Sequence, residues 1–341
     1  MLASFSYSKL NDIELYYHNY KQQNIIFTPK YSRQTMKEKF FIFLKGIAMG
    51  SADVVPGVSG GTVAFITGIY ERLLKAISAV DIEALKLLSK FKFKELWDKL
   101  DLGFLFPLFL GIGTAIVSLA KIMKYLLENE PIGLWSFFFG LIIASALLVS
   151  KQVGKWNTGS IISLIIGVIL SYYITIATPA QSPEGLIYIF FAGMIAICAM
   201  ILPGISGSFM LLLMGQYHNI LDSVSNFKLD VIAAFCAGAG IGIISFARVL
   251  TFLLNKFHDI TIALLTGFMI GSLNKVWPWK KVVETYTDRH GNIKPLLESN
   301  LLPQNFEGDN QLVLALLLSI VGFLLVVGIE KVADKQNHSS E

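Results

Sequence analysis

Six stretches of the sequence are apolar for long enough to cross a lipid bilayer as helices. A helix rises about 1.5 Å per residue and the hydrocarbon core is about 30 Å thick, so roughly 20 apolar residues are needed. These stretches exclude a single soluble core and predict a membrane protein. The predicted transmembrane helices cover residues 103–127, 133–150, 160–178, 231–254, 260–276 and 311–329.

The composition agrees with insertion into a membrane. Of the 341 residues, 54% are hydrophobic and 15% are charged, whereas soluble domains contain about 25% charged residues. Residues 1–39 are polar and contain no apolar run before a cleavage site, so no signal peptide is expected. Cys198 and Cys236 lie in apolar segments, and their spacing predicts neither a disulfide nor a metal site.

The chain contains an internal repeat. A shift of 147 residues aligns "PGVSG" at 56–60 with "PGISG" at 203–207, and a shift of 127 residues aligns the helices that follow, pairing Lys121 with Arg248. The extra chain in the first copy coincides with the lysine-rich stretch 81–101, which we expect to be an amphipathic helix on the membrane surface. Internal duplication of this kind is typical of transporters.

The distribution of positive charge predicts how each copy enters the membrane. Residues 1–45 and residues 71–101 each carry seven Lys or Arg, so both flanks are expected on the cytoplasmic side. Gly46 to Pro56 spans eleven residues, about 16 Å of helix, which suits a re-entrant hairpin between them. One hairpin and three crossings give each copy an odd number of crossings, so the second copy is expected to be inverted.

The predicted fold is therefore an all-α, polytopic membrane protein with two inverted repeats and both termini cytoplasmic. The expected order is a cytoplasmic tail (1–39), a first repeat (40–180) with a hairpin at 41–77, and a second repeat (185–330) with a hairpin at 186–222 and an outer loop at 274–309. The outer loop carries five Lys or Arg, which departs from the charge rule, although long loops tolerate such departures.

The two repeated motifs are expected to interrupt their helices. Proline disfavours helix in the residue before it, and glycine permits a turn with positive φ. Because unpaired backbone groups are tolerated at membrane depth only beside protein or a water-filled cavity, each break should line a cavity. The residues predicted to form these loops are Pro56, Gly57, Pro203 and Gly204.

Each break is predicted to offer an anion-binding site. Ser59 and Ser206 are placed to cap the outgoing half-helices, whose first backbone amides would be free to bind a phosphate group. The alternative is that Pro and Gly only kink packed membrane helices, where both are common. The predicted phosphate-binding residues at the two breaks are Ser59, Gly60, Gly61, Thr62, Ser206, Gly207 and Ser208.

Three charged residues are further candidates. Asp53 lies three residues before Pro56, and it is either a coupling site for a proton or cation or a structural acid. The second copy has Met200 at that position, so any coupling is asymmetric. Lys121 and Arg248 either extend their charges to the membrane surface or contact phosphate oxygens in opposite leaflets.

The sequence does not favour an enzyme. It contains no G-x-x-x-x-G-K-[ST], H-E-x-x-H or C-x-x-C pattern, and its five histidines are scattered. We therefore predict no catalytic residue, no metal and no cofactor. Half-helix ends that meet inside a membrane also occur in channels, so the pattern alone does not separate a carrier from a channel.

The stretches "GSADVVPGVSGGTVAFITGIYERLL" and "AICAMILPGISGSFMLLLMGQY" resemble the bacterial polyprenyl-phosphate (undecaprenyl-phosphate) translocase family. The resemblance covers residues 40 to 330. It implies a plasma-membrane flippase that returns undecaprenyl phosphate to the inner leaflet for reuse in peptidoglycan and teichoic-acid synthesis. It also implies re-entrant hairpins and dependence on a proton gradient. The expected partners are the membrane and the lipid, with no nucleic acid.

The alternative to a lipid flippase is a secondary carrier for a small soluble anion, since the same loops would bind either substrate. The sequence also leaves open the coupling ion, the direction of net transport and the oligomeric state, a homo-oligomer included.

Overall fold

The computed structural model describes residues 35–55, 58–177, 185–287 and 293–338. Contacts divide the chain into residues 1–38 and one larger unit, residues 39–341. In the first unit, the start of α2 carries a capping box: the amide of Thr35 donates to the Glu38 carboxylate over 2.8 Å, and the amide of Glu38 donates to the Thr35 hydroxyl over 3.3 Å.

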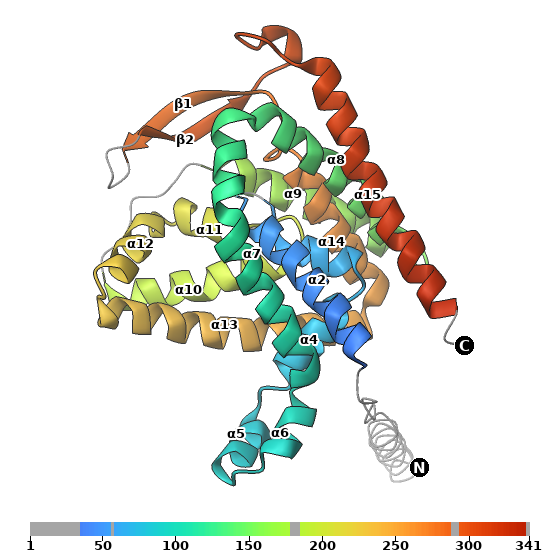
Figure 1. Ribbon diagram of the computed structural model, residues 1–341, viewed down its shortest axis with the longest axis vertical. Coiled ribbons are helices and arrows are strands. Elements are labelled where there is room, and N and C mark those ends of the chain that lie inside the picture. The colour runs from blue at the N-terminus through green and yellow to red at the C-terminus, as the bar shows by residue number, and fades with distance from the viewer. Residues whose placement is uncertain (1–34, 56–57, 178–184, 288–292, 339–341) are drawn as a thin grey trace, which may run out of the picture. The chain divides into compact units, whose positions relative to one another are not determined.

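The described elements follow the predicted duplication (Figure 1). The first repeat contains α2 (Met36–Asp53), α3 (Gly60–Ile66), α4 (Tyr70–Ser78), α5 (Ile82–Ser89), α6 (Phe93–Lys99), α7 (Leu102–Asn129), α8 (Pro131–Ser150) and α9 (Thr158–Ile176). The second contains α10 (Leu186–Ile201), α11 (Gly207–Leu213), α12 (Tyr217–Ser225), α13 (Leu229–Lys256), α14 (His258–Ser272), β1 (Lys280–Thr287), β2 (Ile293–Asn300), the 3₁₀ helix η1 (Pro303–Asn305) and α15 (Leu312–His338). Helices α3 and α4 match α11 and α12 at a shift of 147 residues, and α7 matches α13 at 127. The inversion of one copy relative to the other stays a prediction.

Among the described residues, five helices are long and apolar enough to cross a membrane: α7, α8, α9, α13 and α15. The protein is therefore a predominantly α-helical, polytopic membrane protein. About 72% of the α8 span is buried inside the molecule, against 17–33% for the other four, so α8 is the inner span and the others present apolar side chains outward. The sixth predicted span, 260–276, is shorter than expected, because α14 ends at Ser272 after 15 residues.

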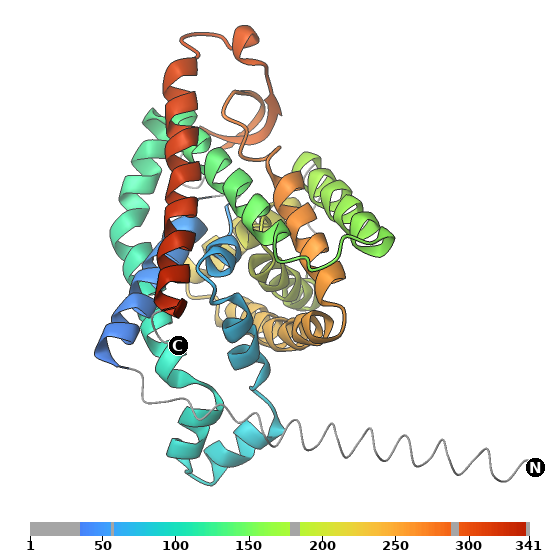
Figure 2. The ribbon, with the colours of Figure 1, turned by 90° about the vertical axis from the view of Figure 1, so that its right-hand side faces the viewer.

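Two pairs of packed helices each combine a helix of the first repeat with a helix of the second. Helix α8 of the first repeat packs against α15 of the second, and α14 of the second packs against α9 of the first (Figures 1 and 2). Gly140 in α8 lies against the backbone of Ser319, and Gly267 in α14 lies against the backbone of Leu164. These two glycines are equivalent at the 127-residue shift, so the same close contact is made twice.

Two segments differ from the sequence-based expectation. The predicted surface helix 81–101 consists of two short helices, α5 and α6, because Phe91 between them has a positive φ of 55°. The outer loop 274–309 contains an antiparallel hairpin in which Lys280 lies opposite Asn300. The run "KKVVETYT" in β1 is rich in the β-branched and aromatic residues that favour strands.

The helix before the first break is also longer than predicted. Helix α2 begins at Met36 and contains 18 residues, about 27 Å of helix, rather than the half-bilayer length inferred from Gly46 to Pro56. Helix length alone therefore does not decide between a re-entrant and a spanning segment, and the re-entrant hairpins remain a prediction.

Candidate functional site: two helix breaks in contact

The first break lies between the end of α2 at Asp53 and the start of α3 at Gly60. Ser59 has extended backbone angles (φ −119°, ψ 129°), and its hydroxyl accepts a hydrogen bond from the Gly61 amide over 3.1 Å. This is the N-cap that the sequence predicts. Two predicted loop residues, Pro56 and Gly57, lie outside the described residues.

A carboxylate occupies the amide end of α3. The Asp53 Oδ1 atom accepts a hydrogen bond from the Gly60 amide over 2.7 Å. The sequence predicts free amides here, so the structure differs: the protein supplies its own anion to this end of the helix. The arrangement shows that an oxyanion fits at the Gly60 amide.

The second break lies between the end of α10 at Ile201 and the start of α11. It contains Pro203 in a turn and Gly204 with a positive φ of 84°, the conformation that favours glycine. The Ser206 hydroxyl does not cap the helix as predicted, but lies 2.9 Å from the Ser208 hydroxyl. The position of Asp53 is taken here by Met200, so this break has no acid of its own.

The two breaks touch each other. The Ser59 hydroxyl lies 3.2 Å and 3.1 Å from the carbonyl oxygens of Met200 and Leu202, which share its proton. The Gly204 amide donates to the Thr62 hydroxyl over 3.0 Å. Tip residues from both copies are buried: Ser59, Gly60, Gly61, Thr62, Ser206 and Gly207. Among the described residues, the repeat thus brings Ser59 and Thr62 of the first break into contact with the second break, in a closed arrangement.

The backbones approach closely at this contact. A Cβ atom added to Gly61 would lie 2.5 Å from the carbonyl oxygen of Ile201, and one added to Gly204 would lie 2.9 Å from both the Phe268 carbonyl and the Ser272 hydroxyl. Cβ atoms almost never come that close to other heavy atoms. The glycines of the two motifs are therefore required by packing as well as by turn geometry.

The two basic residues predicted to bind phosphate are not brought together with the breaks. The Arg248 guanidinium donates to the carbonyl oxygens of Ser78 and Val80, over 3.3 Å and 2.6 Å, at the end of α4. Lys121 is exposed on α7, and no contact with either break is found for it among the described residues. The proposal that both contact phosphate has no support from their positions.

Two basic residues of the first repeat hold its short helices to their neighbours. The Lys45 ammonium donates to the carbonyl oxygen of Thr67 at the end of α3 over 2.8 Å. Arg72 forms a two-pronged ion pair with Asp101, with N···O distances of 2.6 Å and 3.0 Å, and stacks over the Phe104 ring. These contacts join segments that are far apart in sequence.

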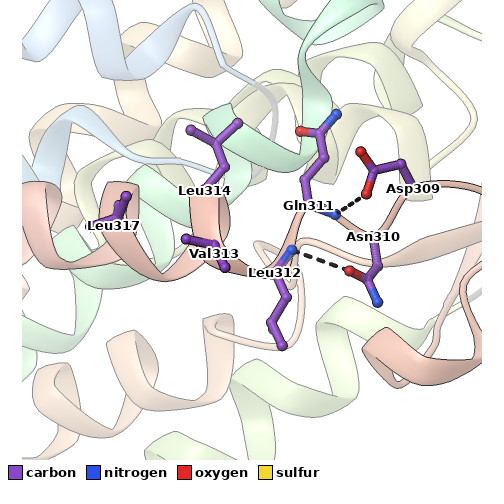
Figure 3. A pocket seen from close by; sticks show the side chains of 7 residues that line it. All are labelled: Asp309, Asn310, Gln311, Leu312, Val313, Leu314 and Leu317. Atoms are coloured by element: carbon purple, nitrogen blue, oxygen red, sulfur yellow. Dashed lines mark hydrogen bonds between the residues drawn. The ribbon is translucent and has the colours of Figure 1, made fainter.

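An open cavity of about 640 Å³ lies elsewhere, at the start of α15 (Figure 3). Its rim contains two local caps: Asp309 accepts from the amide of Gln311 over 3.0 Å, and Asn310 accepts from the amide of Leu312 over 3.2 Å. None of the break residues lines it. Among the residues that the structure describes, no group of His, Cys, Asp and Glu side chains could hold a metal ion.

Comparison with known proteins gives consistent matches. Residues 49–294 match the family model described as undecaprenyl phosphate translocase-like. A polyprenyl-phosphate transporter of Vibrio cholerae is 44% identical over 297 residues, which cover 86% of this chain and 96% of that protein. A polyprenyl-phosphate transporter of Staphylococcus aureus is 34% identical over 258 residues, which cover 70% of this chain and 87% of that protein.

No solved structure matches the chain. Both relatives are named as transporters rather than as enzymes, in agreement with the lack of catalytic motifs in the sequence. The family match includes both helix breaks and spans more than half of the chain. The protein therefore belongs to the undecaprenyl phosphate translocase-like family.

Proposed function

We propose that the protein is a flippase that returns undecaprenyl phosphate from the outer to the inner leaflet of the plasma membrane, for reuse in the synthesis of cell-wall polymers. The observation that carries this proposal is the family match, together with 44% identity to a named polyprenyl-phosphate transporter over almost all of that protein. A protein with five long apolar helices suits a substrate that itself resides in the bilayer.

We further propose that the two breaks bind the phosphate group. Support comes from the Asp53 carboxylate, an oxyanion that hydrogen bonds to the Gly60 amide at 2.7 Å. A phosphate oxygen forms the same charge-assisted hydrogen bond. Thr62 and Gly204 bind each other across the two breaks, so separating the copies would expose polar groups from both at once.

Asp53 gives this site a means of coupling to an ion gradient. As a carboxylate it competes with the phosphate for the Gly60 amide and repels it; when protonated it no longer repels the phosphate and holds the amide more weakly, because a neutral carboxyl is the poorer acceptor. Protonation would thus open the amide to phosphate, and deprotonation would expel the phosphate. The second break, with Met200, lacks this control. Proton coupling would act through one copy only.

A leaflet-resolved assay in vesicles tests the proposal. The full-length protein is reconstituted, undecaprenyl phosphate is placed in one leaflet, and its appearance in the other is followed. Ser59→Ala and Ser206→Ala should each slow transport by roughly 10-fold, because the first removes the hydroxyl that bonds to the other break and the second removes the hydroxyl that bonds to Ser208 within its own break. Normal transport by both variants would refute the assignment of the site.

Matched controls are available on the same repeats. The hydroxyls of Ser118 and Ser245 donate to carbonyl oxygens of their own helices, Thr114 and Ile241, over 2.6 Å in each case. Changing either serine to alanine should leave transport within about two-fold of wild type, since neither touches a break. If wild-type vesicles move a soluble phosphate or organic acid but not the lipid, the flippase is refuted in favour of the small-anion carrier.

A further inference from the structure

The outer hairpin holds two lysines against a single carboxylate. Lys275 follows the end of α14, and Lys280 is the first residue of β1. Their ammonium nitrogens lie 3.8 Å and 3.5 Å from the same Glu298 oxygen on β2. Two positive charges thus share one negative charge. The exposed fractions of the side chains are 21% for Lys275, 7% for Lys280 and 24% for Glu298, so water does little to offset the excess.

Aromatic rings from both repeats complete the surroundings of the two ammonium groups. The Lys280 nitrogen lies 3.9 Å from the centroid of the Trp135 ring on α8, and the Lys275 nitrogen lies 4.5 Å from that of Phe209 on α11. Burial lowers the pKa of Lys275 and lowers the pKa of Lys280 to about 8, although Glu298 raises both. Neither the rings nor the carboxylate fully replaces the lost water.

This lysine pair lies beside the second break. Phe209 is three residues beyond Ser206, in the first turn of α11. The backbone amide of Lys275 donates to the carbonyl oxygen of Ser272 over 2.8 Å, and the Ser272 hydroxyl lies 2.9 Å from the position of a Cβ on Gly204. The Phe209 ring beneath the Lys275 ammonium therefore belongs to the helix that follows the second break. The turn that carries Lys275 packs on the same break.

The base of the hairpin is held firmly. The indole nitrogens of Trp277 and Trp279 donate to the carbonyl oxygens of Leu301 and Asn310, each over 2.8 Å. These two bonds tie the start of the hairpin to the segment that follows it. The lysines on either side of the two tryptophans are therefore positioned in advance. Such preorganisation reduces the entropy lost when a ligand is bound.

We propose that Lys275 and Lys280 form a docking site for a phosphate monoester, through which the headgroup of the transported lipid reaches the second break. The inference rests on the proposed function and extends it. A phosphate monoester carries about −1.5 to −2 charges at neutral pH and three acceptor oxygens, enough to bind both ammonium groups. The phosphate displaces Glu298 from the lysines, so the carboxylate weakens the docking that the lysines provide.

A structural role for the same residues predicts a different pattern. If the cluster only anchors the hairpin, removing either the lysines or the carboxylate breaks the same ion pairs, and all the variants change binding in the same direction. If the cluster docks phosphate, removing Lys280 weakens binding, whereas removing the Glu298 charge strengthens it. The sign of the Glu298→Gln effect therefore separates the two roles.

Equilibrium binding of farnesyl phosphate to the full-length protein in detergent tests the proposal. Lys275→Gln and Lys280→Gln should each weaken binding about 10-fold or more, because each removes a charge-assisted hydrogen bond. Glu298→Gln should tighten binding roughly 3-fold to 10-fold. The matched control is Lys281→Gln, since Lys281 is the next residue along β1, exposed and paired with Glu307 at 3.2 Å; it should stay within about two-fold of wild type.

Two competitors distinguish the source of the phosphate. Neutral farnesol should not compete in the binding assay, which would confirm that the lysines recognise the phosphate rather than the tail. If inorganic phosphate binds with the same dependence on Lys275 and Lys280, the site stands and free phosphate is a ligand as well. If farnesyl phosphate binds as tightly to Lys275→Gln and Lys280→Gln as to wild type, or if Glu298→Gln weakens binding, the docking site is refuted.

Failure of this inference is distinguishable from failure of the proposed function. If the wild-type protein neither binds nor transports a polyprenyl phosphate, the proposed function fails. If the wild type does both, and Lys275→Gln and Lys280→Gln transport and bind normally, only the docking site fails. Lys280→Arg, which keeps the charge, serves where Lys280→Gln does not fold, and it should retain most of the binding.

Discussion

The two helix breaks share one sequence pattern but differ in charge. At the first, the Asp53 carboxylate holds the Gly60 amide, so the break already contains an anion. At the second, Met200 stands at the position of the acid, and Lys275, which shares Glu298 with Lys280, lies over the Phe209 ring in the first turn of α11. The same turn therefore occurs twice, once beside an acid and once beside a basic neighbour.

This difference indicates a division of labour between the copies. In the proposed mechanism, a break that carries its own carboxylate would release a phosphate when the acid ionises, whereas a break beside ammonium groups would attract one. A transporter with two identical breaks would bind its substrate equally in both and gain no direction from the site itself. We therefore propose that the asymmetry gives the site its direction, and the variants below test the two breaks and their charged neighbours.

The largest effect is expected where the two breaks touch. In Gly61→Val, the new side chain would meet the carbonyl oxygen of Ile201, which lies 2.5 Å from the position of a Cβ. The backbones must move apart, and displacements of about 1 Å at a site cost on the order of 100-fold in rate. We expect transport in vesicles to fall by that factor. The control is Gly113→Val on α7, where nothing lies within 4 Å; equal losses in both variants would contradict the prediction.

The next largest effect tests the acid itself. Asp53→Asn mimics the protonated side chain permanently, so transport should lose its response to a pH gradient and slow by roughly 10-fold, a typical coupling factor. Met200→Asp places an acid at the equivalent position of the second copy and should slow transport as well. Rates measured with and without an imposed gradient check both. Asp230→Asn, in the first turn of α13, is the control for charge loss; a gradient response retained by Asp53→Asn contradicts the coupling role.

The fold could be predicted from sequence wherever the signal is local. Apolar length predicts five of the spans, although α14 is shorter than expected, and the proline and glycine of the second motif predict its break, since both residues act on their own backbone. Ser59 caps α3 as predicted because capping depends on neighbours two residues away. Ser206 shows the limit of this reasoning. The same residue type at the matching position bonds to Ser208 instead.

Contacts between residues far apart in the sequence could not be predicted. Nothing in the sequence indicates that Arg248 binds the carbonyl oxygens of Ser78 and Val80, more than 160 residues away. In the sequence alone, the five basic residues of the outer loop 274–309 indicate only a departure from the charge rule. Their meaning depends on the pairing of β1 with β2, which places Glu298 beside Lys280 across the hairpin.

A moderate effect is expected from pH at the lysine pair. Burial, opposed by Glu298 and assisted by the charge of Lys275, lowers the pKa of Lys280 to about 8, so its ammonium group loses its proton just above neutral pH. Farnesyl phosphate binding should therefore weaken as pH rises from about 7 to 9.5, by roughly the 10-fold assigned to this charge. Lys280→Arg stays charged throughout and should flatten the profile. A profile that is unchanged in Lys280→Arg contradicts the assignment.

The same pKa has a consequence for stability, with a definite sign. In the unfolded chain the pKa of Lys280 is about 10.4, so between about pH 8 and pH 10 the unfolded state binds more protons than the folded state. Stability of the ligand-free protein contributed by this residue then rises with pH across that window. Thermal unfolding of wild type and Lys280→Arg checks it: the difference between them should change with pH in this range and stay constant below about pH 7.

The smallest effect on transport is expected at Lys121 and Arg248, which occupy equivalent positions at the 127-residue shift. If both contacted phosphate from opposite leaflets, changing either to glutamine would slow transport equally. The structure instead gives Arg248 two hydrogen bonds to the end of α4 and leaves Lys121 exposed. Arg248→Gln should lower the free energy of unfolding by about 1 kcal/mol, with transport within about three-fold of wild type, whereas Lys121→Gln should change neither. An equal, 10-fold loss of transport in both variants, with stability unchanged, would instead place both side chains on the substrate path and show that the breaks open far enough to reach them.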